Sequence, residues 1–197
     1  MDEQKRTWAE ISLDNIRHNF FEMKSRLLPG QKFLGVVKAN AYGHGAVQVS
    51  RLLEECGADY LAVACLDEAE QLRDAGIRLP ILILGCTPTE YTDRLIDLDI
   101  TQALGTLENA EAMSAAAVRH GKPVRVHLKV DSGMGRVGFT CHGGRDPIED
   151  MLKVMSLPGL DIEGIFTHFA VSDVLGDKYT DMQFEAFTGI INRLEER

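Results

Sequence analysis

Short β-rich runs alternate with longer amphipathic stretches along this chain, and this order constrains its fold more than any other feature. The β-rich runs cover residues 32–38, 60–65, 80–85, 100–105, 124–131 and 161–169. The stretches with helical periodicity between them cover residues 45–57, 66–76, 88–99, 106–121 and 146–159. Such an order is typical of βαβ units, which place helices on a mostly parallel sheet. We therefore expect an α/β fold.

The ends of the helical stretches carry recognisable signals. Gly57, Gly76 and Gly121 follow the last apolar turn of their stretches, where a left-handed glycine can release the chain into the next strand. Ahead of the first β-rich run, residues 7–30 predict a short strand and then a helix capped by Ser12. No linker or low-complexity segment divides the chain, so we expect residues 1–197 to form one part of a single domain.

Two parallel architectures fit this order, an open doubly wound sheet and a closed barrel. A dinucleotide-binding open sheet carries GxGxxG in its first strand-to-helix turn, whereas that turn reads KANAYGHG here, at residues 38–45. We therefore expect a TIM-type (β/α)8 barrel. A complete barrel has eight strands and typically about 250 residues. Because this chain has 197 residues and about six predicted strands, we expect a barrel truncated after about six strands, with its C-terminal strands missing.

The charge and the residue pattern exclude several kinds of partner. The net charge of -9 and the pI near 5.1 indicate a surface that repels nucleic acid and anionic lipid. The N-terminal residues lack the apolar core of a signal peptide, and no segment approaches the roughly 18 apolar residues of a membrane span. We predict a cytoplasmic protein with no nucleic-acid or membrane partner. The 6 histidines and 4 cysteines show no HExxH, CxxC or mixed ligand spacing, so no metal is predicted.

Polar residues end three of the predicted strands, where the loops of a parallel barrel converge on its active face. Lys38 ends the first run, and His168 lies near the end of the last. In the run at 124–131, the period of two places four polar residues on one face, namely Arg125, His127, Lys129 and Asp131. This row lines the barrel interior, unless the run is an edge strand of an antiparallel sheet. Lys38 and His168 each also have a purely structural interpretation. Lys38 could extend its amine to water, and His168 could be a structural histidine with its hydrogen bonds satisfied.

A glycine-rich segment, DSGMGRVGF at residues 131–139, follows the polar strand. Its glycines permit tight turns close to a ligand, and Arg136 offers a planar fork for a carboxylate or phenolate oxygen. Lys38, Lys129 and Arg136 would place several cations in one interior. Either acidic groups such as Asp131 compensate them, or one lysine carries no charge. An uncharged lysine amine is suited to nucleophilic or Schiff-base chemistry.

These segments resemble alanine racemase, the pyridoxal phosphate (PLP) enzyme that interconverts L- and D-alanine. VVKANAYGHG at 36–45 is similar to the family's cofactor-lysine segment, HLKVDSGMGRVGF at 127–139 to its arginine segment, and FTHFAVSD at 166–173 to its histidine strand. They occur in the family's order and spacing, from TWAEISLDNIRHN at residue 7 onward. Amino acid decarboxylases of the same barrel class share a shorter lysine motif without AYGHG. The resemblance implies a PLP-dependent isomerase that supplies D-alanine for peptidoglycan.

The resemblance also implies roles for individual residues. Lys38 would hold PLP as a Schiff base and act as one of two bases at the substrate α-carbon. Tyr42 would bind the cofactor phosphate, and Arg136 would contact the cofactor phenolate oxygen and the substrate carboxylate. Lys129 would be carried as a carbamate whose negative charge orients Arg136. His168 would join the hydrogen-bond network beside the cofactor ring.

Family members continue for about as long again, and that second half is expected to complete the barrel and the site. It carries phosphate-binding loops and a second-base tyrosine donated across the interface of a homodimer. Because racemisation needs proton transfer on both faces of the carbanion, the fragment alone is expected to have little or no activity. Its unpaired strand edges are expected to cause self-association. Two alternatives stay open, serine as the small amino acid substrate and a non-catalytic PLP-binding module.

Overall fold

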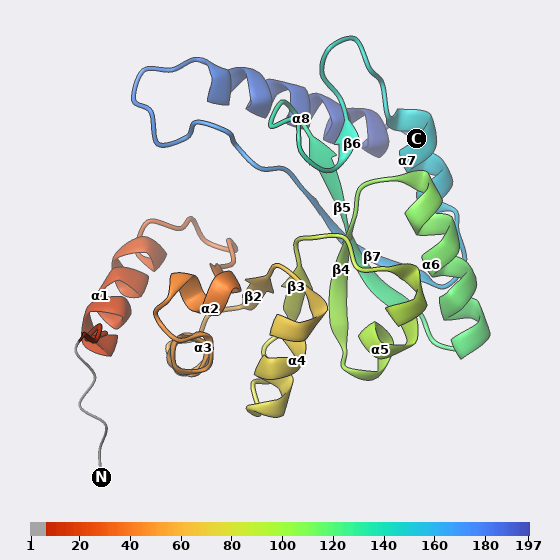
Figure 1. Ribbon diagram of the computed structural model, residues 1–197. Helices are drawn as coiled ribbons and strands as arrows, with labels where there is room; N and C mark the ends of the chain where they lie inside the picture. Colours follow the sequence, from red (N-terminus) through yellow and green to blue (C-terminus); the bar gives the residue numbers. More distant parts are fainter. Residues whose placement is uncertain (1–6) are drawn as a thin grey trace.

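The computed structural model describes residues 7–197, and its centre is a 7-stranded sheet in which every pairing is parallel (Figure 1). The strands are β1 (Leu34–Val36), β2 (Tyr60–Val63), β3 (Ile81–Ile83), β4 (Ile100–Leu104), β5 (Val124–Asp131), β6 (Phe139–Thr140) and β7 (Leu160–Phe166). They follow the chain order from β1 to β5, and β5 then pairs with β7 along most of its length and with β6 at its end. All six predicted runs are strands, and the two-residue β6 is the addition.

Helices follow the strands around the sheet in chain order (Figure 1). They are α1 (Leu13–Lys24), α2 (Lys38–Tyr42), α3 (Ala46–Glu55), α4 (Leu66–Asp74), the 3-10 turn η1 (Thr89–Tyr91), α5 (Thr92–Asp97), α6 (Leu107–His120), α7 (Ile148–Met155) and α8 (Tyr179–Glu195). Every predicted helical stretch contains a helix. The short α2 was not predicted, because the residues after Lys38 were interpreted as a loop.

The period of two divides the strand side chains between two hydrophobic clusters. Leu61, Val63, Ile81 and Ile83 are fully buried in the larger cluster, together with apolar residues of the helices. The side chains between them form a small cluster on the other face of the sheet, which comprises Ala62, Leu82 and Ala103 with Phe166 packed against it. One face of the sheet is therefore covered by helices, while the other encloses the interior of a curved, barrel-like wall.

The local signals at the helix ends are mostly confirmed. Gly57, Gly76 and Gly121 adopt φ of +80°, +82° and +83°, as expected of left-handed helix ends. The Ser12 hydroxyl accepts a hydrogen bond from the N–H of Asn15 at 3.2 Å, which caps α1. The short strand predicted ahead of Ser12 is wrong. Within the described chain, residues 7–12 are exposed and pair with no strand, and a lone extended segment is not stable without a partner.

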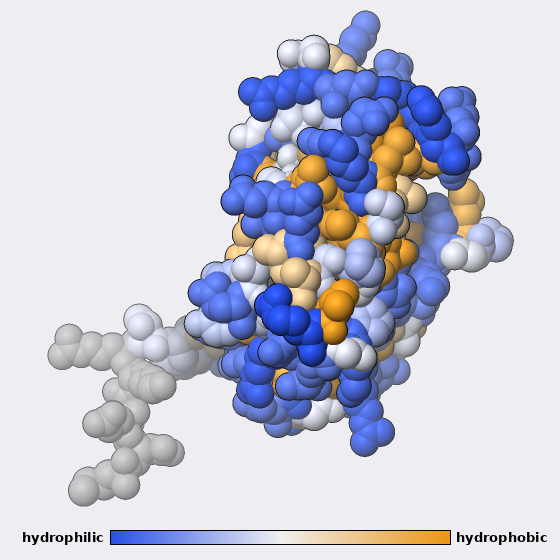
Figure 2. All heavy atoms as spheres, turned by 90° about the vertical axis from the view of Figure 1, so that its right-hand side faces the viewer, coloured by the Kyte–Doolittle hydropathy of each residue, from blue (hydrophilic) through white to orange (hydrophobic). Residues whose placement is uncertain are grey.

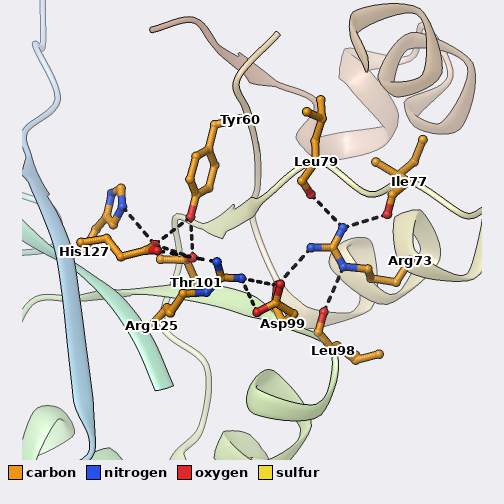
Figure 3. A network of polar contacts seen from close by, with 10 residues as sticks. Tyr60, Arg73, Ile77, Leu79, Leu98, Asp99, Thr101, Arg125 and His127 are labelled. Atoms are coloured by element: carbon orange, nitrogen blue, oxygen red, sulfur yellow. Dashed lines mark hydrogen bonds and ion pairs between the residues drawn. The ribbon is translucent and has the colours of Figure 1, made fainter. Parts of the chain in front are cut away.

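Polar side chains of β5 face the interior, as the sequence predicted, and join a network with neighbouring strands (Figure 3). The Tyr60 hydroxyl lies 2.5 Å from Thr101 Oγ1 and donates to Glu163 Oε2 at 3.1 Å. Arg125 and His127 approach the same Glu163 carboxylate, at 3.6 and 3.9 Å. Burial raises the pKa of Tyr60 to about 12 and lowers the pKa of His127. Because β5 pairs in parallel on both sides, the antiparallel interpretation is wrong.

The sheet is open: among the described residues, β1 pairs only with β2, and β7 pairs only with β5. A groove of about 340 Å³ runs beside β7 and the end of α8, and its apolar lining comprises Leu128, Met155, Ile162, Ile165, Ile191 and Leu194. Figure 2, which views the side where α6, α7 and the C-terminus lie in Figure 1, shows hydrophobic residues gathered among polar ones. The expected self-association through such edges stays a prediction.

No helix within residues 7–197 combines the length and the apolar character that crossing a membrane requires.

Candidate active site at the ends of the strands

The five residues to which the family resemblance gives roles line a single cavity of about 620 Å³, which we call the Lys38 cavity. They are Lys38, Tyr42, Lys129, Arg136 and His168. Its apolar wall comes from the strands and the segments just after them, and includes Leu34, Val36, Leu82, Leu84, Ile165 and Phe166. The ends of parallel strands converge at one rim, which explains how residues up to 130 positions apart in the chain meet here (38 to 168).

Lys38 reaches the cavity because it continues the alternation of β1. Leu34, Val36 and Lys38 share one face and line the cavity, while Gly35 and Val37 are buried on the opposite face. Lys38 lies just after β1 and is half-buried. The reason is that the cavity face of β1 is itself partly open, with Val36 41% exposed. The Lys38 Nζ lies 5.9 Å from the centre of the Tyr42 ring.

The backbone immediately after Lys38 forms a left-handed turn. Ala39, Asn40, Ala41 and Tyr42 have φ between 51° and 54°, although none is glycine. Each such residue costs about 1–2 kcal/mol relative to a right-handed conformation, so the turn needs outside support. Part of that support comes from Asn40 Oδ1, which accepts a hydrogen bond from the N–H of Ala46 at 2.8 Å. The left-handed turn was not predicted from the sequence.

The role of Glu68 was also not predicted from the sequence. It lies in the first turn of α4, and its Oε1 accepts a hydrogen bond from the N–H of Ala39 at 2.7 Å. Its Oε2 accepts a hydrogen bond from the N–H of Ala64, just beyond β2, also at 2.7 Å. The only signal in the sequence is an acidic residue early in a helix, which is common and predicts favourable helix-dipole interactions rather than a site.

The glycine-rich segment places Arg136 at the rim of the cavity by folding back on β5. Asp131 Oδ1 accepts hydrogen bonds from the N–H groups of Gly133 and Gly135, at 3.1 and 2.9 Å. Although burial opposes the charged carboxylate, these bonds and nearby His142 outweigh it and lower the pKa of Asp131. Asp131 thus serves the loop, and no ion pair joins it to Lys129 among the described residues.

Lys129 is the buried cation of the site, only 5% exposed. Its Nζ lies 5.6 Å from the centre of the Phe166 ring. Burial and the guanidinium of Arg136 lower the pKa of Lys129, which favours its neutral amine. Of the two solutions to the cation excess, the burial of Lys129 and the lack of an ion pair with Asp131 among the described residues favour a lysine with less positive charge.

Tyr42, Arg136 and His168 are exposed at the mouth of the cavity. Burial lowers the pKa of His168, and the positive charges of Arg136, Lys129 and Lys38 act in the same direction. At neutral pH the His168 imidazole is thus held in its neutral form. The backbone carbonyl of His168 accepts a hydrogen bond from Gln183 Nε2 at 3.2 Å, which ties this strand end to α8.

The lining of the cavity fits a flat, anionic ligand such as PLP. None of the described residues that line the cavity is an aspartate or a glutamate. Three basic residues line it, namely Lys38, Lys129 and Arg136. Its volume lies within the range of about 300–1,000 Å³ that is usual for small-molecule sites. Apolar side chains suit an aromatic ring, the cations suit phosphate and phenolate oxygens, and a lysine amine can capture an aldehyde.

Comparison with known proteins identifies a family whose sequences and structures resemble this chain. Residues 11–197 match the family model described as alanine racemase, N-terminal domain. An alanine racemase 2 of Caldanaerobacter subterraneus subsp. tengcongensis is 45% identical over 197 residues, which are 100% of this chain and 50% of that protein. The solved structure of a Clostridium difficile 630 alanine racemase in complex with cycloserine superimposes with a TM-score of 0.92 at 42% identity, over 98% of this chain and 52% of that one.

A solved histidine racemase from Leuconostoc mesenteroides subsp. sake also matches, with a TM-score of 0.81 at 31% identity, over 90% of this chain and 47% of that one. This chain spans about half the length of the curated relatives it matches. Its open parallel sheet corresponds to the first part of the barrel in those racemases, in agreement with the truncated barrel that we expected. On the strength of the match over residues 11–197, the chain belongs to the alanine racemase family, as an N-terminal domain.

Proposed function

We propose that this chain is the cofactor-binding part of an alanine racemase, with PLP held at Lys38. The observation that carries the proposal is that five residues from four separate segments line one cavity that is rich in cations and has no carboxylate among its described lining residues. The family uses PLP, and the charge and volume of the cavity suit that cofactor. We also propose that residues 1–197 form one part of a single PLP-binding barrel domain, which is supported by the match of residues 11–197 to the family's N-terminal domain.

The residues of the chain have distinct tasks in this proposal. Lys38 Nζ captures the cofactor and exchanges a proton with the substrate α-carbon on one face. Arg136 binds the phenolate oxygen and the substrate carboxylate, and Tyr42 binds the phosphate. His168, held neutral, donates or accepts a hydrogen bond beside the ring. When bound, PLP withdraws electrons from the substrate α-carbon and stabilises the negative charge left by proton removal.

Alanine is the substrate we propose for the whole protein, because the Caldanaerobacter and Clostridium difficile relatives named above are alanine racemases. The match to a histidine racemase supports the view that this half of the barrel does not by itself select the amino acid. Serine therefore stays an alternative. Loss of the α-deuterium of labelled alanine, with inversion, is expected from the protein that contains both halves. A homodimer is proposed for that protein.

The test of the cofactor site is covalent capture of PLP by the 197-residue chain. Incubation with PLP should give an absorbance band at the edge of the visible range, and reduction with borohydride should leave the cofactor mass on the peptide that contains Lys38. Lys38→Ala should lose the band and the labelled peptide entirely, because a stable adduct needs the amine. Absorbance titration and peptide mass spectrometry measure both results.

Lys32→Ala is the matched control, since Lys32 belongs to the same run but is exposed and does not line the cavity. It should bind PLP as the unsubstituted chain does. The informative contrary result is a label on Lys129, the other amine in the cavity, or an equal label on many surface lysines. Either pattern would refute Lys38 as the cofactor residue.

We further propose that Lys129 carries a carbamate. Its neutral amine attacks CO2, so a C–N bond forms as one C=O π bond of CO2 opens. The nitrogen then loses a proton to solvent, and a buried neutral amine becomes an anion near Arg136. In ¹³C-labelled bicarbonate, a carbamate resonance is expected from the chain and should disappear in Lys129→Arg, which keeps a cation but has no nucleophilic amine. An unchanged resonance in that variant would assign the carbamate elsewhere.

A further inference from the structure

Glu68 joins two backbone segments at the rim of the Lys38 cavity, one just after β1 and one just after β2. One oxygen of its carboxylate binds the N–H of Ala39, the residue after Lys38, and the other binds the N–H of Ala64, after β2, each at 2.7 Å. Hydrogen bonds to a charged acceptor are roughly twice as strong as neutral ones. Both Lys38 and Ala64 line the cavity, so Glu68 fixes two parts of its wall from behind.

The N–H of Ala39 opens the left-handed turn, which makes this bond important. Within the turn, the N–H of Ala41 donates to the carbonyl of Val37 at 2.9 Å. Ala39 lies at the start of the turn, so its N–H has no corresponding carbonyl acceptor inside the turn. A strained run of non-glycine residues persists only when its surroundings impose it. The carboxylate of Glu68 satisfies the first amide of that run and tethers it to α4.

We propose that Glu68 is a positioning residue, which orients the Lys38 side chain toward the cavity by fixing the backbone on its C-terminal side. The inference rests on the proposed cofactor site, because it assigns the purpose of the tether to cofactor capture by Lys38. Glu68 does not line the cavity, and it acts through the amide of Ala39.

A simple capping role explains only one of the two bonds. Glu68 is the third residue of α4, and a glutamate there commonly reaches back toward the start of its own helix, as it does with Ala64. The bond to Ala39 goes to a segment 29 residues away in sequence. Capping predicts a loss of stability alone, whereas positioning predicts a change at Lys38.

The test substitutes Glu68 by Gln, which has nearly the same shape. The amide keeps one acceptor oxygen but turns an NH₂ group toward one of the two N–H donors, so one bond is lost and two donors oppose each other. Capture of PLP at Lys38 should weaken on the order of tenfold, as a shift in the titration midpoint and in the rate of borohydride trapping. Amide hydrogen exchange should become faster at residues 39–43.

Glu70→Gln is the matched control, because Glu70 lies on the same helix and forms a surface ion pair with Arg94 at 2.6 Å. It should change neither the capture of PLP nor the exchange at residues 39–43. Glu68→Asp provides a second variant, in which the charge is kept but the carboxylate is too short to reach both amides. It should fold as the unsubstituted chain does and still capture PLP more weakly.

The two measurements separate this inference from the proposed function. Unchanged exchange at residues 39–43 in both Glu68 variants would overturn the tether, even if PLP binds to Lys38. Faster exchange with unchanged capture would overturn the positioning role. If the unsubstituted chain fails to capture PLP at Lys38, the proposed function fails, while hydrogen exchange still decides whether Glu68 holds the turn.

Discussion

Replacing Gly138 by Ala should destabilise the chain by about 3–5 kcal/mol and displace Arg136 from the cavity. A Cβ atom at Gly138 would lie 2.7 Å from the amide nitrogen of Asp131 and 2.8 Å from the carbonyl oxygen of Lys129. Both neighbours are backbone atoms of β5, which cannot move aside as a flexible side chain can. The φ of Gly138 is +133°, a region that residues with a side chain rarely adopt. The free energy of unfolding from urea denaturation measures the loss.

The structural reason for this sensitivity is the return of the chain along β5. Phe139, directly after Gly138, pairs with Val130, so the loop that carries Arg136 is pressed against the strand that carries Lys129. An alanine at position 138 should therefore displace the loop from β5. It should weaken the capture of PLP and also lower the free energy of unfolding. Gly138→Ala thus tests whether the close approach of two backbones holds the arginine at the rim.

Gly143→Ala is the control for the backbone angle. Gly143 also has a positive φ, +63°, but a Cβ there would meet nothing within 4 Å. Its substitution should cost about 1 kcal/mol, the usual penalty of a left-handed alanine. Equal losses from the two substitutions would show that the contact with β5 contributes nothing.

The features that the sequence predicted depend on periodicity and on single-residue signals. The row of β5 from Arg125 to Asp131 alternates with branched apolar residues, so its two faces could be assigned without a structure. Gly57, Gly76 and Gly121 end helices for a reason that is local to the backbone. The convergence of Lys38, Lys129 and Arg136 followed from the rule that parallel strands present their ends at one rim.

The features that escaped prediction depend on contacts between distant segments. The turn from Ala39 to Tyr42 contains no glycine, and its left-handed form relies on Glu68, which is 29 positions away from Ala39. β6 has two residues, too few for any period to be seen, and it exists because it pairs with the end of β5. The degree of burial of Lys38 also escapes prediction, since burial depends on what covers the open face of β1.

Arg73→Met should cost about 2–4 kcal/mol of unfolding free energy, because it leaves several partly buried carbonyl groups without a donor. The guanidinium donates to the carbonyls of Ile77 and Leu79 at 2.9 and 2.8 Å, and to those of Leu98 and Asp99 at 2.9 and 3.0 Å (Figure 3). These four acceptors follow α4 and α5, so one side chain joins the ends of two helices. Burial lowers the pKa of Arg73, which reflects the cost of desolvating its charge.

Two further substitutions test whether the loss of stability comes from the hydrogen bonds of the Arg73 guanidinium to the four carbonyls. Arg73→Lys keeps the charge but can reach fewer of the carbonyls, so it should recover only part of the stability. Arg51→Met is the matched control, since Arg51 is exposed and donates to the single carbonyl of Ala75 at 3.1 Å. It should cost at most about 1 kcal/mol. Urea denaturation of the three variants measures these differences. Full recovery in Arg73→Lys would assign the effect to charge alone, and equal losses at positions 51 and 73 would contradict a special role for the four-carbonyl junction.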